Sequence, residues 1–344
     1  MQYTVLGNTG LVVSRLSFGA MTFTAGNKSM GAIYKTEADD ANAMVMRALD
    51  AGVNFFDTAD AYAGGESETM LGKALKGRRQ EVVIATKVGY RMGPGLVQTG
   101  LSRRHILQAI DESLRRLGTD FVDVYIAHRE DRYTPLEETL AALDEVVRSG
   151  KARYIGFSNW SAWSVAASME LQKARGWAPF SHGQMHYSLL IRDIERDMIP
   201  VMDRYNLGLT VWSPLVSGFL SGKYTRENLA DKDNRLSGFD IMPFDKEHGF
   251  KLVEKLRAIA DAHKASVAQT AIAWLLAKKA VSSVIVGASK PSQLEDNLCA
   301  AGVALTAAEV AALDEFTKPG IVYPNWFTEA VVDPEVKKAL QGAR

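Results

Sequence analysis

The chain has 344 residues, 47% of them hydrophobic and 23% charged, a composition typical of soluble globular proteins. Its 40 basic and 40 acidic residues cancel, so charge gives no reason to expect nucleic acid or an anionic membrane as a partner. Its single cysteine, Cys299, excludes an intrachain disulfide and a cysteine-rich metal site. No apolar run approaches the roughly 18 residues of a membrane span, and the N-terminus does not have the pattern of a signal peptide, so we expect a cytoplasmic protein.

The first predicted element is a β-hairpin, because apolar runs at residues 3–7 and 11–17 flank the turn sequence Asn8-Thr9-Gly10. A strand at 16–21 and a helix at 36–52 follow. Strands and helices then alternate. Further strands are predicted at 53–57, 81–87, 121–128, 151–158, 178–187, 207–215 and 282–289. Helices are predicted at 66–77, 102–118, 135–150, 163–176, 194–206, 247–264, 267–279, 292–302 and 306–317, with a long loop at 217–246.

Eight strand–helix units in series favour a parallel sheet, either an open doubly wound sheet or a closed (β/α)8 barrel. The number of units favours the barrel, which typically takes about 250 residues plus insertions. The open fold with a dinucleotide site needs a G-x-G-x-x-G fingerprint, and neither GAMTFTAG nor VGYRMGPG matches it. We therefore predict one α/β domain over residues 1–344, a (β/α)8 TIM barrel with an N-terminal hairpin and extra helices. The tail from about 318 to 344 is predicted to cover the barrel mouth.

Polar residues end consecutive predicted strands: Asp57, then Lys87, then His128, with Tyr62 in the loop after the first. Taken singly, each is more often structural, as a turn former, a solvated lysine or a hydrogen-bonded histidine. Together they gather at the carboxyl ends of barrel strands, where barrel enzymes hold their active sites. An ammonium beside a phenol lowers the pKa of the phenol, a carboxylate keeps the lysine charged, and a histidine orients a carbonyl oxygen. The pattern favours protonation of an oxygen that gains negative charge, as when hydride adds to a carbonyl.

The chain resembles the aldo-keto reductases over nearly its whole length. The motifs are GVNFFDTADAY, VVIATKVG, LGTDFVDVYIAHR, IGFSNW, WSPLVSGFLSGKY and VIVGASKPSQLEDN, in the family's order. Their style is closest to the branch of bacterial general reductases and voltage-gated potassium channel β subunits. The resemblance implies a single barrel that binds NADP(H) without a dinucleotide-binding domain. It also implies reversible reduction of aldehydes or ketones to alcohols, with small-molecule carbonyl substrates as the partners.

By this resemblance the catalytic residues are Asp57, Tyr62, Lys87 and His128, with Tyr62 as the general acid. Tyr187 is implied as the aromatic residue that stacks on the nicotinamide. The other cofactor-binding residues implied are Ser158, Asn159, Gln184, Trp212, Ser213, Pro214, Leu215, Gly218, Leu220, Lys223, Arg235, Gly287, Ser289, Gln293, Asp296 and Asn297. The resemblance implies NADP(H) as the preferred cofactor. Gln293 stands where many members have an arginine, so NAD(H) remains an alternative.

The substrate pocket is expected to involve loop residues, each of which has packing over the barrel mouth as the competing interpretation. The candidates are Met21, Phe23, Tyr34, Tyr90, Arg129, Trp160 and Trp326. Arg129 either meets an anionic substrate or pairs with Glu130 or Asp131. The sequence does not indicate the oligomeric state.

Two other functions compete with a reductase. The first is a cofactor-binding regulatory subunit of the channel β type, with weak or no turnover. Retention of His128 favours the enzyme, because such subunits replace this histidine. The second is a metal-dependent barrel isomerase. The six histidines show no clear clustering with carboxylates, so no metal site is predicted.

Overall fold

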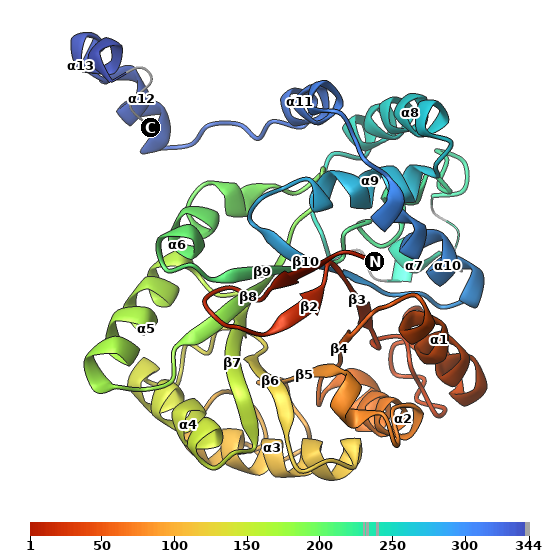
Figure 1. The fold of residues 1–344 in the computed structure, drawn as a ribbon, viewed down its shortest axis with the longest axis vertical. Coiled ribbons are helices and arrows are strands. Elements are labelled where there is room, and N and C mark those ends of the chain that lie inside the picture. Colours follow the sequence, from red (N-terminus) through yellow and green to blue (C-terminus); the bar gives the residue numbers. More distant parts are fainter. Residues whose placement is uncertain (230, 232–233, 239–240, 341–344) are drawn as a thin grey trace.

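The computed structural model describes residues 1–229, 231, 234–238 and 241–340. Eight parallel strands close into a barrel in the order β10-β3-β4-β5-β6-β7-β8-β9 (Figure 1). This confirms the predicted (β/α)8 fold. The strands are β3 Leu16–Gly19, β4 Phe55–Asp57, β5 Val83–Val88, β6 Val122–Ala127, β7 Ala152–Ser158, β8 Phe180–His186, β9 Gly208–Trp212 and β10 Val281–Val286.

Helices surround this barrel (Figure 1). They are α1 Ala38–Asp50, α2 Glu66–Ala74, α3 Arg103–Leu117, α4 Leu136–Arg148, α5 Ala162–Arg175, α6 Met198–Arg204, α7 Arg235–Gly238, α8 Lys246–His263, α9 Val267–Leu276, α10 Pro291–Cys299 and α11 Ala307–Phe316. Short 3₁₀ turns are η1 Tyr62–Gly65, η2 Arg79–Glu81, η3 Asp193–Glu195, η4 Phe219–Ser221 and η5 Ala300–Gly302. The loop predicted at 217–246 contains η4 and α7, and part of it lies outside the described residues.

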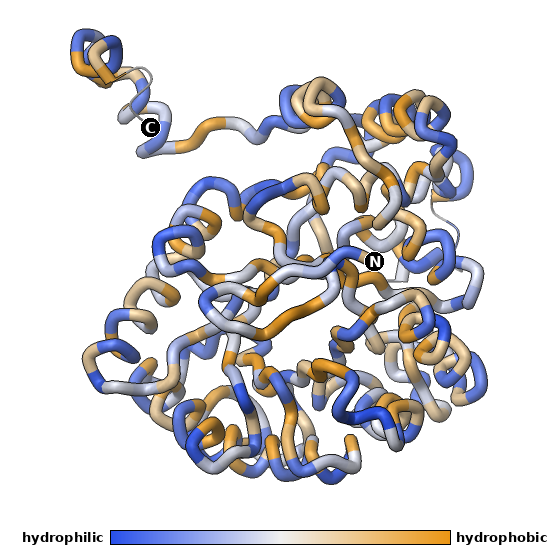
Figure 2. Tube along the Cα trace, viewed as in Figure 1, coloured by the Kyte–Doolittle hydropathy of each residue, from blue (hydrophilic) through white to orange (hydrophobic). Residues whose placement is uncertain are grey.

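The long helix α3 shows how the sequence sets the helix ends. Ser102 caps its first turn by accepting a hydrogen bond from the backbone N–H of His105, and Gly118 ends it with a left-handed φ of 66°. Between these caps, Ile106, Ile110 and other residues at helical spacing are buried against the barrel. Hydrophobic and hydrophilic residues alternate along the surrounding helices in the same way (Figure 2). The main apolar core therefore lies between the strands and the helices.

The N-terminal hairpin consists of β1 Tyr3–Val5 and β2 Val12–Ser14, which pair antiparallel as predicted. It lies across the barrel (Figure 1), where Leu6 and Val13 pack with inward-facing strand residues such as Phe55. Gly7 has a left-handed φ of 57°, and a Cβ there would lie 2.1 Å from the carbonyl oxygen of Ser181. Ser181 is at the start of β8, so the hairpin closes the amino ends of the strands. The carboxyl ends are left for the site.

The C-terminal tail does not cover the barrel mouth, so that prediction is wrong for this structure. Its helices, α12 Asn325–Ala330 and α13 Pro334–Ala339, extend away from the barrel (Figure 1). Trp326 is 51% exposed, and the hydrogen bonds of residues 319–340 stay within the tail. The aromatic content of the tail indicated a pocket lining, but composition carries no information on the direction in which the chain leaves α11. Residues 341–344 lie outside the described residues.

Candidate active site

Four side chains meet at the carboxyl ends of β4, β5 and β6. Asp57 is the last residue of β4, Lys87 is near the end of β5, and His128 directly follows β6. Tyr62 begins the 3₁₀ turn η1, five residues after Asp57. Since β4, β5 and β6 are adjacent and parallel, they bring the predicted tetrad together at one end of the barrel.

Lys87 is the centre of this group. Its side chain is fully buried, and Nζ donates hydrogen bonds to Asp57 Oδ1 at 2.5 Å, the carbonyl of Thr58 at 2.7 Å and the Tyr62 hydroxyl at 3.1 Å. All three ammonium protons are therefore used. Because the lysine donates to the phenol oxygen, the phenol proton is free to point toward another acceptor. Asp57 is held on its other side by Gln184, whose Nε2 lies 2.7 Å from Oδ2.

The pKa of Lys87 is raised above its ordinary value. Burial opposes its charge, but the attraction of Asp57 and Tyr62 and the hydrogen bonds to both outweigh burial. The pKa of Tyr62 is also raised, chiefly by burial, and the Lys87 ammonium offsets only part of this. The Lys87 ammonium thus acts on the phenol pKa in the expected direction, but burial outweighs it, so the phenol pKa is not lowered overall.

His128 is a neutral imidazole in this site. Its pKa is well below the ordinary value because the ring is buried and because Lys87 and Arg129 place positive charges near it. The ring lies edge-on to Tyr62, with centroids 5.6 Å apart, and edge-on to Tyr90, at 4.7 Å. Within the described part of the chain, Nδ1 is buried without a hydrogen-bond partner. A neutral ring can still donate one N–H to a carbonyl oxygen.

The next strands bring a second polar group to the same mouth. Ser158 ends β7 and donates from Oγ to the carbonyl of Gln184 at 2.7 Å. Asn159, at a left-handed φ of 57°, donates from Nδ2 to the carbonyl of His128 at 3.2 Å and accepts at Oδ1 from Trp212 Nε1 at 3.0 Å. The Trp212 indole stacks on His186 with centroids 4.6 Å apart. These predicted cofactor residues therefore do gather beside the tetrad.

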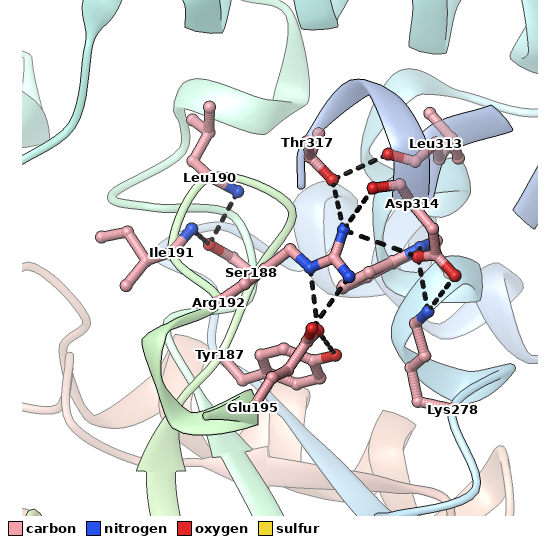
Figure 3. A network of polar contacts seen from close by, with 11 residues as sticks. Tyr187, Ser188, Leu190, Ile191, Arg192, Glu195, Lys278, Leu313, Asp314 and Thr317 are labelled. Carbon is pink, nitrogen blue, oxygen red and sulfur yellow. Dashed lines mark hydrogen bonds and ion pairs between the residues drawn. The ribbon is translucent and has the colours of Figure 1, made fainter. Parts of the chain in front are cut away.

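Tyr187 does not lie at this mouth, and its predicted role as the stacking aromatic is wrong. Its side chain is 1% exposed, and its hydroxyl donates to Glu195 in a buried network with Arg192 and Asp314 (Figure 3). Side chains along a strand alternate between its two faces. Tyr187 comes three residues after the inward-pointing Gln184, just beyond the end of β8, and its ring packs on Trp274 on the other face. Trp212, at the end of β9, is an aromatic residue that does lie at the mouth, stacked on His186. In the sequence, the feature that indicated a place for Trp212 at the mouth was its position at the end of the strand β9.

Lys223, Arg235 and Lys290 form a cationic cluster. The pKa of Lys223 is lowered by burial and by the charges of Arg235 and Lys290, so the three lie near one another. None makes an ion pair with a carboxylate among the described residues, and the buried Nε of Arg235 has no hydrogen-bond partner there. Burial lowers the pKa of Arg235, and the proximity of Tyr224 and Tyr62 opposes this, so Arg235 lies on the same side of the barrel as Tyr62. Unpaired cations around a mouth are suited to an anion.

The loop after β9 connects the mouth to this cluster. Ser213, Val216 and Ser217 all have a left-handed φ between 48° and 53°, a strained arrangement that is frequent at ligand sites. Gly218 also has a positive φ, and a Cβ there would lie 3.1 Å from Lys223 Nζ, so the glycine leaves room for the lysine. Among the other predicted residues of this loop, Pro214 and Leu220 are buried and Leu215 is half-buried. Leu220 belongs to the main apolar core, so it anchors the loop to the barrel.

The residues after β10 divide into two groups. Gly287 is exposed, and Gln293 Oε1 accepts from the backbone N–H and the hydroxyl of Ser289 at 3.1 Å and 3.2 Å. Asp296, in contrast, accepts hydrogen bonds from Ser266 and Gln269 of the neighbouring helix start, so its carboxylate links α10 to α9. Asn297 is buried, 6% exposed. The structure thus leaves Gly287, Ser289 and Gln293 as the accessible members of the predicted set.

Of the predicted substrate residues, Tyr90 and Arg129 lie at the mouth beside His128. Tyr34 and Met21 pack in a small cluster with Ile33 and Ala63, next to η1. Phe23 is fully buried against Phe18 in the main core, and Trp160 is 4% exposed and packs on Phe157 and Phe180. Phe23, Trp160 and Trp326 are therefore not pocket residues in this structure. Sequence position alone could not separate core from loop aromatics.

The described residues contain no group of three or more His, Cys, Asp or Glu side chains that could hold a metal ion. Across the same residues, no single helix is long and apolar enough to cross a membrane. One strongly bent pair, Pro291–Gly302 with Ala307–Phe316, meets the length and composition limits together.

The fold and site define a (β/α)8 barrel with an Asp–Lys–Tyr–His cluster at its mouth. The family model "Aldo/keto reductase family" matches residues 15–318, and the chain belongs to this family. It is 40% identical over 316 residues to a probable voltage-gated potassium channel subunit beta of Oryza sativa subsp. japonica, covering 88% of this chain and 92% of the relative.

Two further relatives carry the names of reductases. The chain is 34% identical to versiconal hemiacetal acetate reductase of Aspergillus parasiticus, over 94% of this chain and 99% of that protein. It is 32% identical to L-glyceraldehyde 3-phosphate reductase of Escherichia coli, over 93% of each chain.

Proposed function

We propose that this oxidoreductase reduces aldehydes or ketones to alcohols with NADPH, and catalyses the reverse oxidation. The observation that carries the proposal is the three-way contact of the Lys87 ammonium with Asp57, the Thr58 carbonyl and the Tyr62 phenol. This arrangement leaves a phenol proton beside a neutral histidine at the open end of a barrel. A proton donor and a hydrogen-bond donor that converge on one point are what a carbonyl oxygen needs as it gains charge.

Tyr62 acts as the general acid. Lys87 donates to the phenol oxygen, so it stabilises the phenolate that remains after the proton has left. Asp57 balances the lysine charge and fixes its position. His128, neutral through burial, binds the carbonyl oxygen and orients it toward Tyr62. In the oxidation direction the same phenolate accepts the proton of the alcohol.

The residues at the mouth fit a phosphorylated nicotinamide cofactor, which would supply the hydride. Ser158, Asn159 and Gln184 present amide and hydroxyl groups beside the tetrad, where they suit the carboxamide. The half-buried indole of Trp212 suits the ring. The cluster of Lys223, Arg235 and Lys290, with the orphaned buried Nε of Arg235, suits phosphates. NADPH carries one phosphate more than NADH, and this phosphate can pair with the three cations. The cluster therefore favours NADPH over NADH.

The test is oxidation of NADPH, followed at its absorbance, with 4-nitrobenzaldehyde and methylglyoxal as substrates. We expect Tyr62→Phe to lower kcat by roughly 100-fold or more, because the general acid is lost while the ring is kept. Tyr205→Phe is the matched control, since its exposed hydroxyl contacts only Glu170 on the outside of the barrel. Equal, negligible rates for wild type and Tyr62→Phe over a broad carbonyl panel would contradict the proposal.

A second candidate is a cofactor-binding regulatory subunit. It is favoured by the 40% identity to the rice protein, whose name is that of a channel subunit. The two candidates differ in turnover, because a subunit of this kind would bind NADPH tightly but oxidise it slowly or not at all with any carbonyl compound. Measured NADPH binding without carbonyl-dependent oxidation would select it over the reductase.

A further inference from the structure

Arg129 directly follows the catalytic histidine and lies at the same mouth. We propose that its guanidinium binds an anionic group of the substrate, so that the preferred substrates are aldehydes or ketones bearing a phosphate or a carboxylate. This inference rests on the proposed reductase function and adds the chemical class of its substrate. The charge, the fixed position and the unused donors of Arg129 carry the inference.

The side chain of Arg129 is held in place from two sides. Its Nε donates to the backbone carbonyl of Gly89 at 3.3 Å, and its guanidinium carbon lies 5.4 Å from the centroid of the Tyr90 ring. The described residues offer no hydrogen-bond acceptor to Nη1 or Nη2. The arginine therefore presents a positioned pair of N–H donors, the geometry that binds carboxylate or phosphate through two parallel hydrogen bonds.

The carboxylates next to Arg129 in sequence are occupied by other donors. Asp131 accepts from the backbone N–H groups of Leu101 and Tyr133 and from the hydroxyl of Thr134, using both oxygens. Glu130 accepts from the N–H and hydroxyl of Ser161 and from the hydroxyl of Ser164. Among the described residues, neither carboxylate forms a direct ion pair with Arg129, although the charge of Arg129 is close enough to contribute to the lowered pKa of Asp131, after the hydrogen bonds that Asp131 accepts.

Arg129 is also close to the reacting groups. The guanidinium lies over the Tyr90 ring, which meets the His128 ring edge-on with centroids 4.7 Å apart. The His128 ring in turn lies edge-on to Tyr62, with centroids 5.6 Å apart. The Arg129 charge is near enough to lower the pKa of His128. A substrate whose carbonyl oxygen meets Tyr62 and His128 can therefore place an anionic group across the Tyr90 ring, a few bonds away.

Two more arginines add positive charge to the same loops. Arg91 donates from Nη1 to the carbonyls of Gly93 and Gly95, and Arg132 is exposed. Neither forms an ion pair with a carboxylate of the described chain. The charge of Arg132 also acts on Glu130, and that of Arg129 on Asp131, so these carboxylates offset part of the positive charge of the rim. The cationic side chains that remain attract anionic substrates by their field and lose this advantage at high salt.

The experiment compares each anionic substrate with a neutral partner of the same shape. One pair is 4-carboxybenzaldehyde and methyl 4-formylbenzoate, and the other is glyceraldehyde 3-phosphate and glyceraldehyde. The measured quantity is the ratio of kcat/KM for the charged substrate to kcat/KM for the neutral one. We expect this ratio to exceed roughly 10 for at least one pair, and to fall as salt is raised. The two pairs tell a carboxylate site from a phosphate site.

Variants then assign the preference to Arg129. Arg129→Met should lower the ratio by roughly 10- to 100-fold, since it removes charge-assisted hydrogen bonds. Arg129→Lys keeps the charge but loses the planar fork, so it should restore part of the ratio for the phosphate pair and less for the carboxylate pair. Arg153→Met is the control, because it removes an exposed charge near the start of β7, at the end of the barrel opposite the mouth, and should leave the ratio within about threefold.

A binding measurement separates this inference from the reaction. In the presence of NADPH, calorimetric titration should give tighter binding of glycerol 3-phosphate or 4-carboxybenzyl alcohol than of glycerol or benzyl alcohol, and Arg129→Met should abolish the difference. Turnover of neutral aldehydes with a ratio near 1 that Arg129→Met leaves unchanged would overturn the inference and leave the reductase standing. Absence of all turnover together with Arg129-dependent anion binding would overturn the reductase and keep the anion site.

Discussion

At the scale of single residues, the site depends on where protons and charges are placed in a buried space. Lys87 fixes these positions, because its three hydrogen bonds, to Asp57, the Thr58 carbonyl and Tyr62, orient the carboxylate and the phenol. A lysine can be buried with its charge only when a carboxylate compensates it, and Asp57 does so at 2.5 Å. Asp57 and Lys87 could be predicted because they lie at strand ends, and Tyr62 because it lies in the loop that follows the first of these strands. The net rise in the Tyr62 pKa could not, because burial is a property of the packed structure.

The neutral state of His128 gives a prediction for pH dependence. Its pKa lies well below the ordinary value of a histidine, so lowering the pH toward 6 does not protonate it. The pKa of Tyr62 is above the ordinary value of a phenol, so raising the pH to 8 does not remove its proton. We therefore expect kcat/KM for carbonyl reduction to stay flat from about pH 6 to pH 8. A pH–rate profile checks this, and a step near pH 6.5 that His128→Gln removes would contradict it.

Asp60, two residues before Tyr62, gives a prediction for stability. Its carboxyl is fully buried and no described side chain hydrogen-bonds to either oxygen, although the backbone N–H of Ala61 is close enough to oppose part of the rise in its pKa. Burial and the nearby Glu68 raise its pKa well above the ordinary value. A raised pKa in the folded state means that its contribution to stability is greatest below the unfolded pKa and is lost as the pH rises through the folded pKa. At pH 7, Asp60→Asn should therefore stabilise the protein, on the order of 1–3 kcal/mol.

Thermal unfolding at pH 7 and at pH 4.5 measures this effect. The gain from Asp60→Asn should shrink at the lower pH, where the carboxyl is protonated at less cost in the folded state. Asp50→Asn, at the exposed end of α1, is the control and should change the melting temperature little at either pH. A lower melting temperature for Asp60→Asn at pH 7 would show that an ionised Asp60 is stabilised by its surroundings.

At the scale of elements, a buried polar network attaches α11 to the barrel (Figure 3). Arg192, after β8, binds Glu195 through Nε and Nη2 and donates from Nη1 to the Asp314 carbonyl and the Thr317 hydroxyl. Asp314 also accepts from Trp274 and Lys278. The order of the barrel strands and of the helices up to α11, except the short α7, could be predicted from hydrophobic periodicity and caps. This network could not, because its members are far apart in sequence and meet only through packing.

Arg192→Met should destabilise the fold strongly. It leaves Glu195 and the groups at the end of α11 without their donor, and breaking a buried pair costs about 3–5 kcal/mol. Because Glu195 is partly exposed, with 27% of its side chain accessible, we expect the lower end of this range. Chemical denaturation measures the loss. Arg196→Met is matched to it, since the Arg196–Asp197 pair is half-exposed and should contribute less than about 1 kcal/mol. Equal losses in the two variants would contradict the role given to the network.

At the scale of the whole molecule, zero net charge conceals an uneven distribution. Lys223 and Arg235 come from the segment after β9 and Lys290 from the segment after β10, and the barrel closes these strands side by side. Only the fold brings the three cations together, so composition and formal charge could not reveal the cluster. The resemblance to the family named two of its members, Lys223 and Arg235, and for Lys290 the sequence left two interpretations open, a charge beside Ser289 or a solvated lysine.

The cationic cluster gives the last prediction, on the choice of cofactor. If the three cations hold the extra phosphate of NADPH, then NADPH should bind more tightly than NADH, and the difference should shrink as salt rises from about 0.05 M to 0.5 M. Arg235→Met removes the least accessible of the three charges and should lower the affinity for NADPH by roughly 10- to 100-fold, with a smaller effect on NADH. Quenching of tryptophan fluorescence measures both affinities. Lys251→Met, on the exposed face of α8, is the control. Equal losses for NADPH and NADH in Arg235→Met would place the arginine on a phosphate that both cofactors share, and the preference for NADPH would then need another cause.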